Sequence, residues 1–460
     1  MTDVDLALRL FLQLVVIIGT CRLVGWLGRR FLGQTQVVME MIAGVVLGPS
    51  LFGMLWPGGQ SWLFPQTTPV LGADGIPVIG AHGEALTMRH PSMQILYVMS
   101  QVGLVLYMFI VGLELNTDLI KKHAKSASMV SLSGILGPFA LGVLATPLLF
   151  SKGHAYESGV TFPVAALFTG AAMCITAFPM LARIIYEKGI SQTKLGTLSL
   201  AAGATGDVIA WVVLAVVLAV LKSNARIAAY AVVGGVLFAV FMFTFGKRLF
   251  AWMGRRMEQA GKMTPTLFAG TLLLLMAAAA YTDSIGIYAV FGAFLVGVSV
   301  PQGKYSQALQ EKVEGLTVSL LLPLFFVYSG LNTRLGLLDS PELWLITAVV
   351  IGAAVAGKAI ACTLAAKASG QTWRESWLIG TLMNARGLME LIIINIGLQA
   401  HLITPTLYTM LVLMAIVTTV MASPIFELLY RRLESSLKEE QKAGIVVGAE
   451  LVPELALVDA

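Results

Sequence analysis

Long apolar runs recur along almost the whole chain and determine the solvent in which it folds. Each is about 20 residues long, enough to cross a hydrocarbon core ~30 Å thick. They span roughly 6–27, 37–55, 95–115, 128–150, 162–186, 195–221, 227–250, 264–282, 285–300, 315–332, 343–366, 375–398 and 404–430. Only "YTDSIG" separates the eighth run from the ninth, and fusing the two gives twelve. Because only 12% of the residues are charged, we predict an all-α polytopic membrane protein with about 13 transmembrane helices.

The basic residues indicate how the chain is threaded through the membrane. With the N-terminus outside, cytoplasmic loops carry 22 of the 30 Lys and Arg residues and outer loops carry five. Basic residues concentrate in cytoplasmic loops, so we expect an inner (cell) membrane protein with an outside N-terminus and a cytoplasmic C-terminus. The net charge of +5 is therefore a topology signal, and we expect no nucleic-acid partner. Residues 433–460 are expected to form a short cytoplasmic tail.

Seven charged side chains inside the apolar runs are candidate site residues, because a charge at membrane depth costs roughly 2.5–3.5 kcal/mol on insertion scales. They are Arg9, Glu40, Glu114, Asp207, Lys358, Arg386 and Glu390. Asp207 lies near the midpoint of its run, and the small residues of "AAGATG" before it let a backbone, water or an ion approach. A protonated aspartate that donates one interhelical hydrogen bond is the structural alternative. The functional interpretation is a carboxylate that alternately holds a proton and a cation.

The other intramembrane charges have competing structural explanations. Glu40 and Glu114 lie nearer the ends of their runs, so we interpret them as gate or structural residues. Arg386 and Glu390 are four residues apart, which predicts an intrahelical ion pair; holding the helix together is as good an explanation as transport. Lys358 has no acidic neighbour in the sequence, so it must find a distant partner, stay hydrated or lose its proton.

Two runs contain residues that interrupt a helix. Pro179 in "GAAMCITAFPMLARII" lacks the backbone N–H that a helix interior needs, and Asn384–Gly387 interrupts "GTLMNARGLMELIIINIG". Non-helical backbone survives at membrane depth only where it is buried in protein or lines a cavity. The two interruptions fall in the middle runs of two triplets, 128–221 and 343–430. Such a pairing is typical of the binding site of a secondary transporter.

Seven motifs in order carry a family resemblance. They are "VVMEMIAGVVLGPSLFG", "LYMFIVGLELN", "ITAFPMLARIIYEKG", "GDVIAW", "FGAFLVGVSVP", "LLPLFFVYSGLNT" and "LMNARGLMELIIINIGLQ". Over residues 10–430 the chain resembles the monovalent cation/proton antiporter superfamily, in the branch of bacterial sodium/proton antiporters, potassium-efflux proteins and plant cation/proton exchangers. The resemblance implies inverted structural repeats, two broken helices that cross near the bilayer centre, and a homodimer.

The resemblance also implies a division of the transmembrane domain, residues 1–432, into a core and a scaffold. The core transport helices are expected at approximately 95–221 and 343–430. The scaffold or dimerisation helices are expected at approximately 6–55 and 227–332.

The resemblance implies roles for several residues. It matches Asp207 to the aspartate that binds the monovalent cation and the proton. Thr176 and the opened backbone at Ala177 match the first broken helix, beside the ion. Arg386 and Glu390 match the second broken helix.

One position departs from the family pattern. In electrogenic members, the counterpart of Lys358 pairs with an acid just before the essential aspartate, whereas this chain has Gly206 there. One carboxylate instead of two predicts exchange of one proton for one cation without net charge movement. The alternative is that Lys358 itself titrates and supplies a second proton.

Together these features predict a secondary-active Na⁺ or K⁺/proton antiporter that works by alternating access, with proton and cation competing for Asp207. Its partners are the cation, the proton, the lipid bilayer and a second copy of the chain; we expect no cofactor, no catalytic residue and no enzymatic activity. One alternative is a channel-like potassium-efflux protein on the same fold. Another is a proton-coupled transporter of a larger organic solute, with Lys358 and Arg386 binding the substrate.

Overall fold

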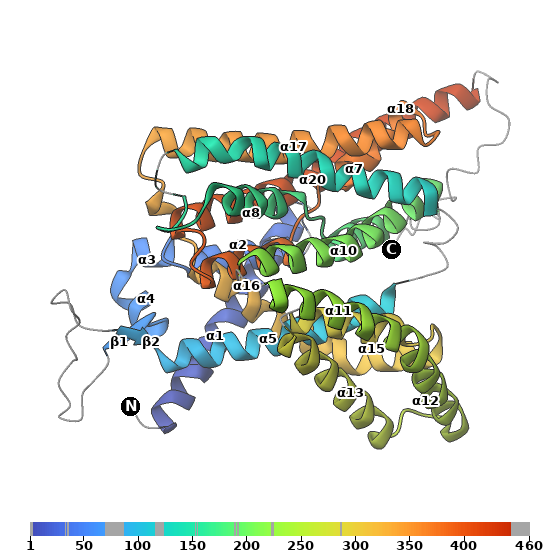
Figure 1. Ribbon diagram of the computed structural model, residues 1–460, viewed down its shortest axis with the longest axis horizontal. Coiled ribbons are helices and arrows are strands. Elements are labelled where there is room, and N and C mark those ends of the chain that lie inside the picture. Colours follow the sequence, from blue (N-terminus) through green and yellow to red (C-terminus); the bar gives the residue numbers. More distant parts are fainter. Residues whose placement is uncertain are drawn as a thin grey trace. The chain divides into compact units, whose positions relative to one another are not determined.

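Helices form almost all of the structure. The computed structural model describes residues 3–32, 34, 36–69, 87–115, 124–151, 153, 155–187, 190, 193–221, 225–285 and 288–442 (Figure 1). The described strands are β1 (Thr67–Pro69) and β2 (Thr87–Arg89), which pair antiparallel with Thr67 opposite Arg89. In lipid, every backbone N–H and C=O must be satisfied internally, so apolar runs of this length fold as helices.

The helices agree with the predicted apolar runs. Within the described ranges, nine helices are long and apolar enough to cross a membrane, and three shorter apolar helices have 10–17 residues. Each of the thirteen runs overlaps at least one helix. The eighth and ninth runs are the separate helices α13 (Pro265–Ser284) and α14 (Ala289–Ser299). The prediction of an all-helical polytopic membrane protein is confirmed.

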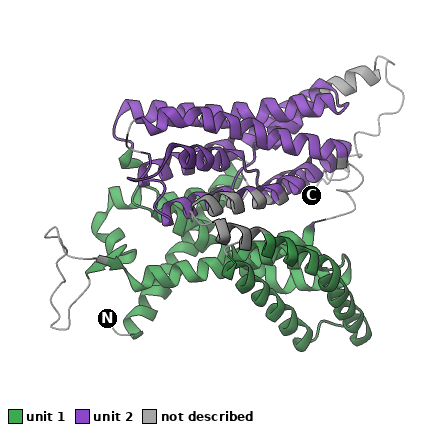
Figure 2. Ribbon diagram, viewed as in Figure 1, with its two compact units in different colours: residues 1–32, 39–114, 233–337 green, residues 33–38, 115–232, 338–460 purple. Residues whose placement is uncertain are grey.

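The described chain divides into two compact units (Figure 2). Unit 1 comprises residues 1–32, 39–114 and 233–337, and unit 2 comprises residues 33–38, 115–232 and 338–460. Besides β1, β2, α13 and α14, unit 1 contains most or all of α1 (Asp3–Leu27), η1 (Gly28–Leu32), α2 (Gln36–Leu47), α3 (Phe52–Leu55), α4 (Pro57–Leu63), α5 (Pro91–Glu114), α11 (Ala225–Phe241), η2 (Met242–Gly246), α12 (Lys247–Ala260), α15 (Lys304–Leu316), η3 (Thr317–Leu321), α16 (Leu322–Leu331) and η4 (Leu335–Leu337).

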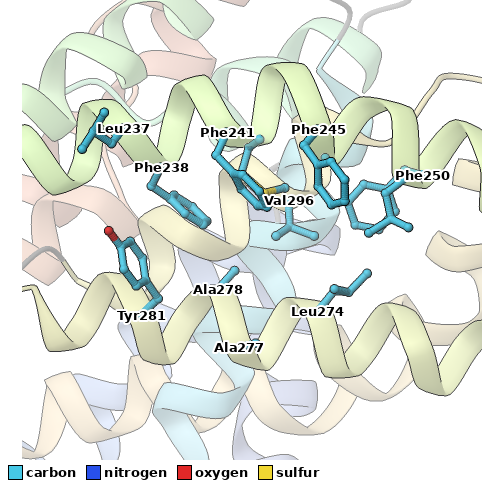
Figure 3. A pocket seen from close by; sticks show the side chains of 13 residues that line it. Leu237, Phe238, Phe241, Phe245, Phe250, Leu274, Ala277, Ala278, Tyr281 and Val296 are labelled. Atoms are coloured by element: carbon cyan, nitrogen blue, oxygen red, sulfur yellow. The ribbon is translucent and has the colours of Figure 1, made fainter.

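Unit 1 is an apolar assembly held by close helix contacts. A Cβ at Gly297 of α14 would lie 2.8 Å from the Gly112 Cα of α5, so small residues let these two backbones touch. A cavity of about 430 Å³ lies between α11–η2–α12 and α13, with Phe238, Phe241 and Tyr281 among its lining residues (Figure 3). No lining residue carries a charged side chain, so this cavity lacks the chemistry expected of a cation-exchange site.

Most of unit 2 is formed by two triplets with the same order: a long helix, a helix in two halves, and a second long helix. The first triplet is α7 (Ala124–Phe150), α8 (Phe162–Cys174), α9 (Phe178–Glu187) and α10 (Lys194–Leu221). The second is α17 (Pro341–Ala368), α18 (Trp373–Leu382), α19 (Leu388–Gln399) and α20 (Pro405–Lys442). The helices α7 and α17 lie side by side (Figure 1).

Both predicted helix interruptions are present, and they touch. Residues 175–177 separate α8 from α9, and residues 383–387 separate α18 from α19. The Ala177 N–H donates to the Ala385 carbonyl oxygen at 3.1 Å. Pro179 is the second residue of α9 rather than the point of the break, because a proline at a helix start removes no intrahelical hydrogen bond.

The two units differ from the predicted core and scaffold in one whole helix, α5, and in short parts of α2 and α11. The contacts group α5 with unit 1, whereas the sequence placed residues 95–115 with the transport core. Which unit moves and which forms a dimer surface stays a prediction. The helix α20 continues to Lys442, and the rest of the predicted tail, residues 443–460, lies outside the described residues.

Candidate functional site

Asp207 lies in the middle of α10 and is fully buried. Neither carboxylate oxygen makes a hydrogen bond with any part of the chain that the structure describes. The Phe178 backbone amide, which falls short of hydrogen-bond geometry, and the Lys358 ammonium act on the carboxylate electrostatically. A buried carboxylate without partners is very costly as a bare charge. Asp207 therefore needs either a proton or a cation.

Lys358 of α17 is held at the broken end of another helix. It is fully buried, and its Nζ donates to the Cys174 carbonyl oxygen at 2.6 Å. Cys174 is the last residue of α8, where carbonyls lack intrahelical partners and the helix dipole is negative. Of the three outcomes predicted for Lys358, the structure shows a distant partner. That partner is a backbone oxygen rather than an acid.

Arg386 and Glu390 form the predicted ion pair, but not within one helix. Arg386 Nη1 lies 3.0 Å from Glu390 Oε1, and both side chains are fully buried. Arg386 belongs to the non-helical segment, whereas Glu390 lies in the first turn of α19. The prediction of an intrahelical pair is wrong in this respect. The reason is electrostatic: a carboxylate is favoured at a helix N-terminus, and from there it neutralises an arginine in the break.

The second break is also fastened to its neighbouring helices. Thr419 Oγ1 of α20 accepts from the Arg386 N–H at 3.2 Å and donates to the Arg386 carbonyl at 2.8 Å. Arg386 Nη2 donates to the Ala354 carbonyl of α17 at 3.3 Å. Backbone and side chain of Arg386 are thus both bound to packed helices, and they hold this break in one conformation.

The other predicted site residues separate into two groups. Thr176 and Ala177 are buried in the first break, in the same unit as Asp207. Glu40 and Glu114 belong to unit 1. Glu40 is buried in α2 beside the Cys21 thiol, and Glu114 is exposed at the end of α5, where its Oε1 accepts from Gln310 Nε2 at 2.9 Å.

A contact with Ser131 of α7 explains why a glycine, Gly206, precedes Asp207. A Cβ at Gly206 would lie 3.2 Å from Ser131 Oγ, so a larger side chain at residue 206 would have to displace the hydroxyl. Sequence reasoning missed Ser131 and Thr419, although both are polar residues inside apolar runs. It also missed the Cys174 carbonyl and the Phe178 amide, because backbone groups leave no residue-type signal.

Comparison with known proteins decides the family. A sequence profile described as "Sodium/hydrogen exchanger, transmembrane" matches residues 15–431. The chain belongs to this family. It is therefore a multi-pass membrane protein of a transporter family and not an enzyme. The resemblance drawn from the seven motifs is confirmed.

Two relatives are similar to this chain over almost all of its length. "Na(+)/H(+) antiporter NhaS4" of Synechocystis sp. (strain ATCC 27184 / PCC 6803 / Kazusa) is 38% identical over 431 residues, which cover 93% of this chain and 98% of the relative. "K(+)/H(+) antiporter 1" of Saccharomyces cerevisiae is 32% identical over 92% of this chain, and the match spans 46% of the yeast protein, about half its length.

A solved structure shows the same fold. The sodium proton antiporter MjNhaP1 from Methanocaldococcus jannaschii matches with a TM-score of 0.54 and 16% identity, over 92% of this chain and 96% of that chain. At this identity the likeness shows the fold alone.

Proposed function

We propose that this protein exchanges a monovalent cation, Na⁺ or K⁺, for a proton, and that both compete for the Asp207 carboxylate. The observation that carries the proposal is a fully buried carboxylate with two unpartnered oxygens, beside two helix breaks that contact each other. The relatives named for sodium/proton and potassium/proton antiport support a monovalent cation without choosing between the two ions.

Coupling follows from competition at one carboxylate. A bare charge at membrane depth costs several kcal/mol, so the transport core changes its access only when Asp207 carries a proton or a cation. Thr176 and the opened backbone beside Ala177 supply neutral oxygens to the ion. The charges of Lys358 and Glu390 stay at the helix ends throughout the cycle.

The exchange is electroneutral in this proposal. Asp207 is the carboxylate that changes its partner, while Lys358 keeps its proton throughout the cycle and stays bound to the Cys174 carbonyl, 2.6 Å away. Currents on a solid-supported membrane test this point. A robust cation-driven current would contradict electroneutral exchange and would favour Lys358 as the source of a second proton.

The proposal includes the architecture inferred from the family. Thirteen membrane crossings start outside and end in the cytoplasm, with the two triplets of unit 2 as inverted repeats that form the transport core. Unit 1 provides the scaffold and the surface for a homodimer. The common helix order of the two triplets supports the repeats, and the distribution of basic residues supports the orientation.

Transport of a larger organic anion is a weaker alternative. In that alternative Lys358 and Arg386 bind the substrate. Lys358 already donates to Cys174, and Arg386 is paired with Glu390 and hydrogen-bonded to Ala354. Both cations therefore have partners within the protein.

Proton flux in proteoliposomes tests the central claim. Li⁺, Na⁺, K⁺ and Rb⁺ are added separately over a range of pH to wild type, Asp207→Asn and Asp283→Asn. Asp283 is an exposed aspartate at the end of α13, so its variant is the matched control. We expect cation-dependent flux in wild type and the control, and none in Asp207→Asn. Undiminished flux in a folded Asp207→Asn protein would overturn the proposal.

A further inference from the structure

Buried side-chain oxygens without hydrogen-bond partners are unevenly distributed along unit 2. Within the described parts of its two triplets, the neutral residues with such an oxygen are Ser131, Ser199, Thr363 and Asn384. All four side chains are more than nine-tenths buried. Buried hydroxyl and amide oxygens are normally satisfied by protein, water or an ion.

The three hydroxyls lie toward one end of unit 2. The helices α7 and α17 run antiparallel, because Gly134 contacts Cys362 whereas Gly137 contacts Gly357. The first residues of α7 and the last residues of α17 therefore lie at the same end of unit 2. Because α8 and α9 run back along α7, the first residues of α10 lie at this end too. We call it the α7-start end.

Each hydroxyl belongs to a different helix near that end. Ser131 is the eighth residue of α7, and Ser199 is the sixth residue of α10. Thr363 is the sixth residue from the end of α17. Three helices thus contribute unsatisfied oxygens to the same half of the unit.

Neutral polar side chains described in the opposite half of the triplets are hydrogen-bonded. Thr146 donates to the Gly142 carbonyl and Thr169 to the Ala165 carbonyl, both at 2.9 Å. The Asn395 Nδ2 donates to the Leu391 carbonyl at 2.8 Å, and its Oδ1 accepts from the Tyr408 hydroxyl at 3.3 Å. No polar side-chain atom of these residues needs an outside partner.

The loops at that opposite end are also bound to each other. Tyr156, before α8, pairs with Ile403, before α20, in an isolated β-bridge. The Glu157 N–H donates to the Leu402 carbonyl at 3.2 Å, and the Thr404 N–H donates to the Ala155 carbonyl at 3.0 Å. Burial raises the pKa of the Tyr156 phenol to about 12, so its hydroxyl stays neutral beside Thr169. Hydrogen bonds therefore join these two loops at this end of unit 2.

Asn384 connects the unsatisfied half to the helix breaks. Its Nδ2 donates to the Gly380 carbonyl at 3.1 Å, which leaves Oδ1 free. Thr363 Oγ1 occupies the space that a Cβ at Gly380 would need, so Thr363 and Asn384 both lie against Gly380. The residue after Asn384 accepts the Ala177 N–H, one residue before the Phe178 amide that acts on Asp207.

We propose that Ser131, Ser199, Thr363 and Asn384 line a polar passage through which the monovalent cation reaches Asp207 from the α7-start end, and that Asn384 Oδ1 is one of its ligands. Neutral oxygens replace the hydration shell of a monovalent cation as it enters a protein. Gly206 serves the same passage, because it leaves room for the Ser131 hydroxyl next to Asp207. The inference rests on the proposed exchange at Asp207.

Cysteine accessibility tests the passage without any transport assay. The parent protein carries alanine at Cys21, Cys174 and Cys362 and is first shown to retain flux. Ser131→Cys and Thr363→Cys are compared in proteoliposomes with Thr146→Cys and Thr169→Cys, which place the thiol in the satisfied half. A membrane-impermeant methanethiosulfonate reagent is added from each side in turn.

We expect the first two thiols to react from the side where α7 starts, and the reaction to slow when Na⁺ or K⁺ is present. The two thiols of the satisfied half stay unmodified from that side. Failure of Ser131→Cys and Thr363→Cys to react from that side, or equal reaction at all four positions, would overturn the passage.

Asn384→Ala tests the ligand. We expect the cation concentration for half-maximal proton flux to rise by about tenfold, equivalent to ~1.4 kcal/mol, while the matched variant Asn395→Ala changes it less than about twofold because that amide is fully hydrogen-bonded. Asn384→Asp preserves shape if the alanine variant fails to fold. It should also change the relative response to Na⁺ and K⁺.

The two proposals fail in distinguishable ways. Flux that survives in Asp207→Asn removes the proposed function. Flux that is lost in Asp207→Asn but keeps a wild-type half-maximal cation concentration in Asn384→Ala and Asn384→Asp removes only the ligand assignment.

Discussion

The charges at the two helix breaks of unit 2 are neutralised in different ways. Around the first break, the charges come from other helices: Lys358 of α17 binds the last carbonyl of α8, and Asp207 of α10 lies near the first amide of α9. The second break has its own pair, Arg386 and Glu390, whose charged atoms are 3.0 Å apart. Two charged residues within one segment stay paired when helices move. An unpartnered acid on a separate helix is instead available for exchange.

This difference indicates that the second break stabilises the fold and that ion exchange takes place at the first. At the second break, Arg386 is bound to Glu390, Ala354 and Thr419. At the first, Asp207 has two oxygens without partners among the described residues. Substitutions at the second break should therefore change stability first, and substitutions at Asp207 should change flux first.

Breaking the buried ion pair should have the largest effect on stability. Arg386→Met leaves Glu390 as an uncompensated buried charge, and such losses lower the free energy of unfolding by about 3–5 kcal/mol. The double variant Arg386→Met/Glu390→Leu should recover much of this loss, because an apolar pair of similar volume is often nearly neutral in stability. Melting temperatures of purified protein check the comparison. A double variant that is no more stable than Arg386→Met would show that the pair does not act as a unit.

Removing the Lys358 ammonium should have the next largest effect. Lys358→Met deprives the last carbonyl of α8 of a charged donor, and such hydrogen bonds contribute roughly 1.5–3 kcal/mol. The melting temperature should fall, while any remaining exchange stays electroneutral. A wild-type exchanger that carries current, together with a Lys358→Met variant that does not, would instead identify the lysine as a transported-proton site.

The sequence predicted those parts of the site that depend on residue type and spacing. The apolar runs predicted the helices, the polar interruption at Asn384–Gly387 predicted the second break, and the four-residue spacing of Arg386 and Glu390 predicted their pairing. Asp207 stood out because few charges occur at membrane depth. These features are local, so a single chain is enough to recognise them.

The parts that were missed depend on contacts between distant segments. Lys358 binds a backbone carbonyl 184 residues away, and any residue at that position presents the same oxygen. The hydrogen bonds of Thr419 to Arg386 join positions 33 residues apart. Which helices pack together, as α5 does with the other helices of unit 1, is likewise not determined by hydrophobicity alone, and the division into core and scaffold stays a prediction.

Removing one hydroxyl that fastens the second break should have a smaller effect. Thr419→Val loses the hydrogen bonds to the Arg386 N–H and carbonyl, with a cost of about 1–3 kcal/mol for the groups left unpaired. Thr418→Val is the matched control, because the Thr418 hydroxyl bonds only to Met414 and Ala415 in its own helix. The melting temperature should fall clearly more in Thr419→Val. Similar losses in both variants would mean that α20 does not hold the break.

Filling the space before Asp207 should have the smallest effect and tests the packing of the first break. The Cβ of Gly206→Ala would lie 3.2 Å from Ser131 Oγ, and this crowding opposes the gain of about 1 kcal/mol that alanine has over glycine inside a helix, so the net change in stability should be small. The same substitution in a Ser131→Ala background should cost less, since the crowded oxygen is gone. A double-mutant cycle of melting temperatures measures this coupling. Identical costs in both backgrounds would show that α7 does not limit the side chain at position 206, and the absence of a second acid there would then need another explanation.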